Sequence, residues 1–396
     1  MNSPKRRLFA GALALTLVAA ACGSDDDSSE ETGDTSAPTE ETGDTSAPTE
    51  ETGDTSAPTE ETGSASGTLI GAGASSQAAG MQGWQAGFQA ANPDATVEYD
   101  PIGSGGGRET FLSGGSDFAG SDAALKDDEF EQSKDRCAGD QGAINLPHYI
   151  SPIAIPYNLP STEGSTVNLT PELVAGIFAN EITNWTDPAI AEINPDIEFP
   201  DLAVNPVHRS DDSGTTENFT DYMAQTAPDI WTYGPIEPWD VDGPGGGEGA
   251  PQTSGVVAAV AAGEGSIGYA DASQIGDLPA AAVGVAGEFV EFSPEAAGRI
   301  VDASERTGGR SEYDFAIEVN RNPDTADSYP IALVSYHIVC LEYEDQETVD
   351  LVKAFMTYVG SAEGQAASQA AAGSAPISPD VSAEILVSID QIAVGG

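Results

Sequence analysis

Apolar residues recur along most of the chain with two spacings, that of strands and that of helices. Residues 67–73 and 95–99 have the length and apolar content of short strands. Between them, Met81, Trp84 and Phe88 recur every three to four residues, which predicts a helix. Strands that alternate with helices in this way are typical of an α/β fold with parallel or mixed sheets.

The same two patterns continue to the C-terminus. Further strands are predicted at residues 117–119, 150–157, 203–208, 266–269, 281–292 and 329–340. Further helices are predicted at residues 109–112, 256–262, 347–372 and 379–392, after Thr170-Pro171, and around Phe219 to Met223. The body of the protein is therefore predicted to alternate strands and helices throughout.

Residues 1–22 have the pattern of an export signal. A basic cluster at residues 5–7 precedes an apolar run that ends at Ala21, shorter than the roughly 20 apolar residues of a membrane-spanning helix. Cys22 follows three alanines, which resembles a bacterial lipoprotein signal whose cysteine becomes the acylated N-terminus. We therefore expect an exported protein, lipid-anchored through Cys22 to the outer face of the cytoplasmic membrane. Ordinary cleavage with release is the alternative.

Residues 23–66 form a polar segment with no aromatic and no basic residue. Within it, residues 31–60 are the decapeptide ETGDTSAPTE written three times. Such a sequence buries too little apolar surface to offset the entropy lost on ordering. We expect a disordered acidic linker between the membrane and the folded body.

The chain carries 13 Lys and Arg residues against 65 Asp and Glu residues, a formal net charge of −52. This balance excludes nucleic acid as a partner, because nucleic-acid binding needs a basic surface. It also excludes electrostatic attachment to an anionic bilayer. A solvated acidic surface is the simplest interpretation of the charge.

With Cys22 assigned to the lipid, the remaining cysteines are Cys137 and Cys340. An exported compartment permits a disulfide between them. Two buried free thiols are the alternative, so the pairing is a hypothesis at this point.

Four polar loops that follow predicted strands contain the candidate chemistry. They are residues 74–76, 103–107, 120–122 and 209–216. Small residues and helix starts in such loops present free backbone N–H groups, which bind anions. Hydroxyl groups and the planar guanidinium of Arg209 add further donors for an oxyanion. A plain turn at residues 105–107 and a simple helix cap at residues 213–215 are the alternatives.

In this order and spacing, the loops resemble those of a known family. The sequences are GAGASS at residues 71–76, IGSGGG at 102–107, FAGSDAAL at 118–125 and RSDDSGTT at 209–216. They are similar to the phosphate-binding proteins of bacterial phosphate ABC importers. The similarity extends over residues 67–396.

The resemblance implies a two-lobed periplasmic-binding-protein fold of type II, with a mixed sheet flanked by helices in each lobe. One lobe would comprise residues 67–150 and 330–396, and the other residues 151–329. The implied function is that of an extracytoplasmic binding protein, not an enzyme, that captures inorganic phosphate between its lobes. It would deliver phosphate to the transmembrane permease of an ABC importer, and no cofactor is implied.

The resemblance also implies which residues bind phosphate. They are Ser75, Ser76, Ser104, Asp122, Arg209, Ser213, Gly214 and Thr215. Asp211 occupies the position that braces the arginine. Ser76, Asp212 and Glu248 depart from the family pattern, and Asp212 adds a negative charge beside the site.

A serine-dependent or phosphate-ester hydrolase on the same fold is an alternative, because His208 and Ser213 lie in one polar segment. The chain lacks a G-x-S-x-G motif, and its other histidines, His148 and His337, lie in apolar strands where a structural role is expected. No spacing of His and Cys residues predicts a metal site. A surface interaction protein that retains the fold is a third interpretation.

Overall fold

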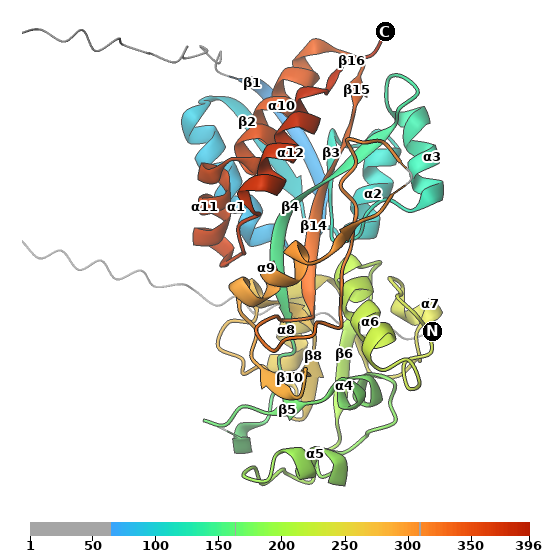
Figure 1. The fold of residues 1–396 in the computed structure, drawn as a ribbon, viewed down its shortest axis with the longest axis vertical. Coiled ribbons are helices and arrows are strands. Elements are labelled where there is room, and N and C mark those ends of the chain that lie inside the picture. The colour runs from blue at the N-terminus through green and yellow to red at the C-terminus, as the bar shows by residue number, and fades with distance from the viewer. Residues whose placement is uncertain (1–64, 163, 309) are drawn as a thin grey trace, which may run out of the picture. The chain divides into compact units, whose positions relative to one another are not determined.

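The computed structural model describes residues 65–162, 164–308 and 310–396, which are drawn in colour in Figure 1. The predicted signal, Cys22 and almost all of the predicted linker lie outside the described residues. Along the described chain, the predicted alternation of strands and helices is confirmed.

The largest sheet has six strands in the order β2-β1-β3-β14-β4-β9. They are β1 (Ser66–Gly73), β2 (Asp94–Asp100), β3 (Phe118–Ser121), β4 (Ala143–Ala154), β9 (Ala270–Asp271) and β14 (Ala332–Cys340). β1 pairs in parallel with β2 and β3, whereas β14 pairs antiparallel with β3 and β4. The sheet is therefore mixed, and it joins segments that are far apart in the sequence.

Helices flank this sheet on both sides. They are α1 (Ala78–Ala91), α2 (Ser104–Leu112), α3 (Asp127–Arg136), α10 (Gln346–Gly360), α11 (Ala362–Ala372) and α12 (Pro379–Asp390). In Figure 1, α1 and α10–α12 lie on one side of the sheet, and α2 and α3 lie on the other. Met81, Trp84 and Phe88, whose spacing predicted the first helix, are buried on α1.

A second group of elements surrounds two three-stranded sheets with the orders β7-β6-β8 and β11-β10-β5. The strands are β5 (Asn168–Leu169), β6 (Asn205–Arg209), β7 (Glu248–Ala250), β8 (Ser266–Gly268), β10 (Ala282–Val285) and β11 (Glu288–Val290). The helices are α4 (Pro171–Phe178), α5 (Pro188–Ile193), α6 (Gly214–Thr226), α7 (Trp239–Asp242), α8 (Gln252–Ala262) and α9 (Pro294–Asp302). Stacked aromatic rings, among them Phe219 on Tyr269 and His208 on Trp239, fill its core.

Two 3-10 turns, Pro160–Thr162 and Ala272–Gln274, and two short strand pairs lie outside these groups of elements. The strand pairs are β12 (Glu305–Arg306) with β13 (Ile317–Glu318), and β15 (Glu342–Tyr343) with β16 (Ala393–Val394).

The two longest strands, β4 and β14, connect the six-stranded sheet to the second group. Every residue of both strands is buried, and the two pair antiparallel from Ala143–Cys340 to Pro152–Ala332. A strand that is buried on both faces needs a continuous apolar run, which explains why these segments gave the strongest strand signal. At its far end, β4 pairs with β9 through Ile153 and Asp271.

Several predicted extents are wrong. The strand predicted at 281–292 is the hairpin β10–β11, because Ala286 and Gly287 both adopt positive φ in a two-residue turn. The helix predicted at 347–372 is divided into α10 and α11, since Ser361 accepts a hydrogen bond from the Gly364 N–H and begins a new helix.

Two other elements begin earlier than predicted. β4 begins at Ala143, seven residues before the predicted start at 150. α2 begins at Ser104, so the glycines predicted to form a loop at 103–107 lie largely within a helix. Glycine is a poor helix former, and local propensity therefore misplaced this start.

Cys137 at the end of α3 and Cys340 at the end of β14 form a disulfide, with their Cα atoms 5.5 Å apart. Both side chains are buried. Within the described ranges, no helix combines the length and the apolar content that crossing a membrane requires.

The disulfide closes a chain loop of 203 residues. We expect its removal by paired Cys137→Ser and Cys340→Ser substitution to lower the free energy of unfolding by up to about 5 kcal/mol, because the open chain gains entropy when unfolded. Denaturant unfolding of both proteins measures the difference. Mass spectrometry of non-reduced peptides checks the link, and two freely alkylated thiols in native oxidised protein would contradict it.

Candidate functional site

The predicted anion-binding residues come together where strands of both groups end. Asp122 directly follows β3, and Arg209 is the last residue of β6. Ser104 is the first residue of α2, and Ser213 caps α6 by accepting a hydrogen bond from the Thr216 N–H. All eight predicted ligand residues are buried.

The Asp122 carboxylate is the centre of this arrangement and is only 3% exposed. It accepts hydrogen bonds from Ser76 Oγ at 2.6 and 2.8 Å, from Thr215 Oγ1 at 2.7 Å and from Ser335 Oγ at 2.7 Å. Burial raises the pKa of Asp122, while the hydroxyl donors and the charge of Arg209 oppose the rise. Hydroxyl groups from distant parts of the chain therefore fix one carboxylate.

The guanidinium of Arg209 is held in place by Asp211, as the predicted bracing role requires. Arg209 Nε donates to Asp211 Oδ1 at 2.8 Å, and a second nitrogen pairs with Oδ2. The Gln252 N–H also donates to Asp211 Oδ1, at 2.8 Å. Burial alone would raise the pKa of Asp211, but the hydrogen bonds and charge of Arg209 hold it below its ordinary value.

The start of α2 approaches this ion pair closely. Gly103 has a φ of +100°, and a Cβ there would lie 2.5 Å from Asp211 Oδ2, so glycine is required. The Gly105 N–H donates to the Asp212 carbonyl at 3.1 Å. Asp212 is exposed, so its charge is solvated rather than buried beside Asp122.

Backbone packing joins α6 to the loop at Asp122. A Cβ on Gly214 would lie 2.7 Å from Ala123 N and 2.9 Å from Asp122 Cβ, so this position also needs glycine. The Asp122 N–H donates to Ser104 Oγ at 3.1 Å. Gly214 and Ser104 thus each contact Asp122, although Gly214 belongs to the second group of elements.

Ser75 faces the N-terminal end of α8. Its Oγ lies 3.1 Å from Thr253 Oγ1 and accepts a hydrogen bond from the Thr253 N–H at 3.1 Å. Gln274 Nε2 donates to the Ser75 and Ser76 carbonyls at 2.8 and 2.9 Å. Ser75 therefore lies at the border between the two groups and makes no hydrogen bond to Asp122.

Three polar residues of this site were missed by the sequence analysis: Ser335, Thr253 and Gln274. Ser335 lies in the middle of the apolar strand β14, and Gln77 Nε2 donates to its Oγ at 2.6 Å. A buried hydroxyl needs a hydrogen-bond partner. A serine within an otherwise apolar strand was therefore the one sequence feature that could have indicated a polar contact at Ser335. Thr253 and Gln274 carry no comparable local signal.

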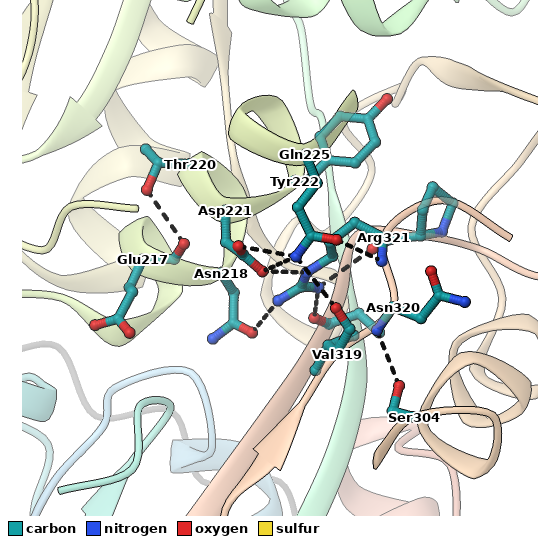
Figure 2. Close-up of polar contacts among 12 residues, drawn as sticks. Glu217, Asn218, Thr220, Asp221, Tyr222, Gln225, Ser304, Val319, Asn320 and Arg321 are labelled. Atoms are coloured by element: carbon teal, nitrogen blue, oxygen red, sulfur yellow. Dashed lines mark hydrogen bonds and ion pairs between the residues drawn. The ribbon is translucent and has the colours of Figure 1, made fainter. Parts of the chain in front are cut away.

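Arg321 fixes α6 against the start of β14, and Figure 2 shows it between Asp221 and Asn218. Its side chain is 2% exposed. It donates to Asp221 Oδ2 at 2.9 Å, to Asn218 Oδ1 at 2.6 Å and to the Ala332 carbonyl at 2.5 Å. Asn218 Nδ2 in turn donates to the Asp122 carbonyl at 2.7 Å, so Arg321 supports the site through one intermediate.

The histidines lie away from any hydrolytic arrangement. His208 stacks on Trp239, with ring centroids 4.9 Å apart, and its Nδ1 lies 2.9 Å from the Arg209 carbonyl. His148 and His337 are buried with their Nδ1 atoms 2.9 Å apart. Within the described ranges no serine hydroxyl is hydrogen-bonded to a histidine, so the hydrolase alternative has no support. The same ranges hold no cluster of three His, Cys, Asp or Glu side chains for a metal.

Two α/β lobes whose strand ends meet at one buried polar site define a substrate-binding protein with a periplasmic-binding-protein fold. A PBP superfamily domain matches residues 58–363. The chain therefore belongs to the PBP superfamily and, by its relatives, to the PstS-type phosphate-binding proteins within it. The two-lobed fold expected from the resemblance is confirmed.

Among the relatives, Phosphate-binding protein PstS 3 of Mycobacterium tuberculosis is 33% identical over 88% of this chain and 87% of that protein. Phosphate-binding protein PstS 3 of Mycobacterium leprae is 34% identical over 73% of this chain and 78% of that protein. A solved phosphate-binding protein from Stenotrophomonas maltophilia is 20% identical and superposes with a TM-score of 0.64. That structure matches 81% of this chain and 94% of its own length, and it shows the fold alone.

Glu217, on the first turn of α6, gives a pH-dependent prediction. It lines a cavity of about 410 Å³ that Asp122 also borders. Burial, together with the nearby Glu237 carboxylate, raises the pKa of Glu217 to about 7. In the unfolded chain the Glu217 carboxyl loses its proton around its ordinary pKa of about 4.3. Between that pH and about pH 7, the folded protein therefore keeps a proton on Glu217 that the unfolded chain has lost.

The free energy of unfolding should consequently fall as pH rises from about 4 to 7. Glu217→Gln removes this penalty, so the variant should be more stable than the parent by roughly 1–3 kcal/mol at pH 8 and about equally stable near pH 4. Thermal unfolding across this pH range measures the difference. An equal stability difference at every pH would contradict the assignment.

Proposed function

We propose that this protein binds inorganic phosphate between its lobes and delivers it to the permease of an ABC importer. The observation that carries the proposal is that a buried carboxylate, Asp122, and a buried guanidinium, Arg209, lie near enough for the charge of Arg209 to act on Asp122, beside two helix starts. Relatives that are 33–34% identical bear the name phosphate-binding protein. The ligands would be the residues expected from the resemblance: Ser75, Ser76, Ser104, Asp122, Arg209, Ser213, Gly214 and Thr215.

The proposed chemistry divides the phosphate oxygens between donors and one acceptor. Arg209, the hydroxyl groups and the backbone N–H groups at the starts of α2 and α6 would donate to unprotonated oxygens. Asp122 would accept the proton that phosphate retains at neutral pH. The hydroxyls of Ser76 and Thr215, which donate to Asp122, are the side chains that would turn toward phosphate.

The cellular arrangement follows from the N-terminal sequence. We infer that the protein is exported, that Cys22 carries a lipid on the outer face of the cytoplasmic membrane, and that residues 23–66 form the linker. The proposed lobes are residues 67–150 with 330–396, and residues 151–329. Comparison of membrane and medium fractions from cells that produce Cys22→Ala tests the anchor.

Titration calorimetry of the purified protein with phosphate tests the proposed function, with Arg209→Ala as the matched variant. Charge-assisted hydrogen bonds contribute roughly 1.5–3 kcal/mol each, so loss of two should weaken phosphate binding about 10²-fold or more. Circular dichroism serves as the control for folding. Wild-type protein that does not bind phosphate, or Arg209→Ala with affinity within about threefold of wild type, would contradict the proposal.

Asp122 should make the site selective against sulfate. Sulfate retains no proton at neutral pH, so it would face the buried carboxylate with an unpaired charge, at a cost of several kcal/mol. We expect roughly 10³-fold preference for phosphate over sulfate, and a much smaller preference in Asp122→Asn. Phosphate titrations in a large excess of sulfate measure both. If excess sulfate weakens phosphate binding as much in wild type as in Asp122→Asn, Asp122 does not determine the selectivity.

A further inference from the structure

A buried ion cluster that contains none of the proposed ligands joins the two proposed lobes. Glu237, which precedes α7, receives two hydrogen bonds from Arg108 of α2, at 2.9 and 2.8 Å. Lys126 Nζ lies 2.5 Å from the same carboxylate. The side chains of Arg108 and Glu237 are each 2% exposed, so this pair is sheltered from water.

Arg108 is also bound firmly within its own lobe. Its Nε donates to Glu129 of α3 at 2.9 and 3.0 Å, and its NH1 donates to Ser121 Oγ at 3.0 Å. Ser121 directly precedes Asp122, so the cluster adjoins the backbone of the candidate site. Arg108 therefore retains a partner carboxylate whether or not the lobes are in contact.

Glu237, unlike Arg108, depends on the opposite lobe for the positive charges that pair with it. Burial would raise the pKa of Glu237, but Arg108 and Lys126 together hold it below its ordinary value. Both of these cations belong to the opposite lobe. From the lobe of Glu237, the carboxyl group of Glu217 on α6 also faces the cluster and supplies no positive charge. Glu237 is thus buried favourably only where the lobes meet.

We propose that Glu237 is a positioning residue for phosphate binding, whose ion pairs with Arg108 and Lys126 hold the lobes closed over the site. Glu237 is not among the proposed ligands, so it would act through the closed arrangement. Closed lobes slow the escape of a bound ligand, so loss of these ion pairs should mainly raise the dissociation rate constant. The effect of Glu237 on phosphate binding rests on the proposed function, whereas its effect on lobe closure does not.

The structure offers a matched pair of variants. Glu237→Gln removes the carboxylate that crosses between lobes, and Glu129→Gln removes the carboxylate that holds Arg108 from its own lobe. Lys126→Gln provides a second variant at a half-exposed position, where misfolding is not expected. Lobe distance is measured by double electron–electron resonance between spin labels introduced by Gln132→Cys and Thr232→Cys, both exposed positions.

We expect Glu237→Gln to lower the closed fraction without phosphate and to raise the phosphate dissociation rate about tenfold or more. Lys126→Gln should change both in the same direction by a smaller factor. Glu129→Gln should leave the dissociation rate within about threefold of wild type. A changed lobe distance in a protein that binds no phosphate would uphold the closing contact and reject the proposed function.

Two results would overturn the proposal. One is a wild-type lobe distance and dissociation rate in both Glu237→Gln and Lys126→Gln. The other is an equal effect of Glu237→Gln and Glu129→Gln on the lobe distance, which would assign the cluster to general stability.

Discussion

The buried carboxylate of Asp122 is the constraint around which the rest of the site is arranged. A carboxylate removed from water needs hydrogen-bond donors or a partner charge, since an unpaired one is costly. Asp122 obtains its donors from Ser76, Thr215 and Ser335, which are carried by a loop after β1, by α6 and by β14. No local segment supplies these donors, so the fold must bring three distant parts of the chain to one point.

The long pair of β4 and β14 makes this convergence possible. Both strands are buried on both faces, and they place Ser335 beside β3, where Asp122 begins its loop. Arg321 then fixes α6 to the start of β14 through Asn218 and Asp221 (Figure 2). The two groups of elements are therefore joined by apolar strand pairing and by buried polar contacts, and the site lies where both kinds of contact meet.

The sequence predicted the parts of this site that have a local signature. Small residues and hydroxyls after strands predicted the loops at Asp122 and Arg209, because a strand end followed by a helix start has a recognisable pattern. Ser335 and Glu237 have no such pattern, since each acquires its role from a partner more than 100 residues away. The early start of α2 was missed for a different reason: close approach to Asp212 at Gly105 and to Gly73 at Gly107 selects glycines that helix propensity disfavours.

The charge of the chain bears on how such a site binds an anion at all. A net charge of −52 would repel phosphate at long range, but charges separated by more than about 10 Å are largely screened at physiological salt. Nearby, Arg209 and Arg321 are each paired with a carboxylate, so the site does not rely on a surplus of positive charge. At the proposed site, binding would then come from short hydrogen bonds in a buried setting, where a wrongly protonated oxyanion would face Asp122 directly. A site of this kind would gain its selectivity from the position of each proton, and the acidic surface is compatible with it.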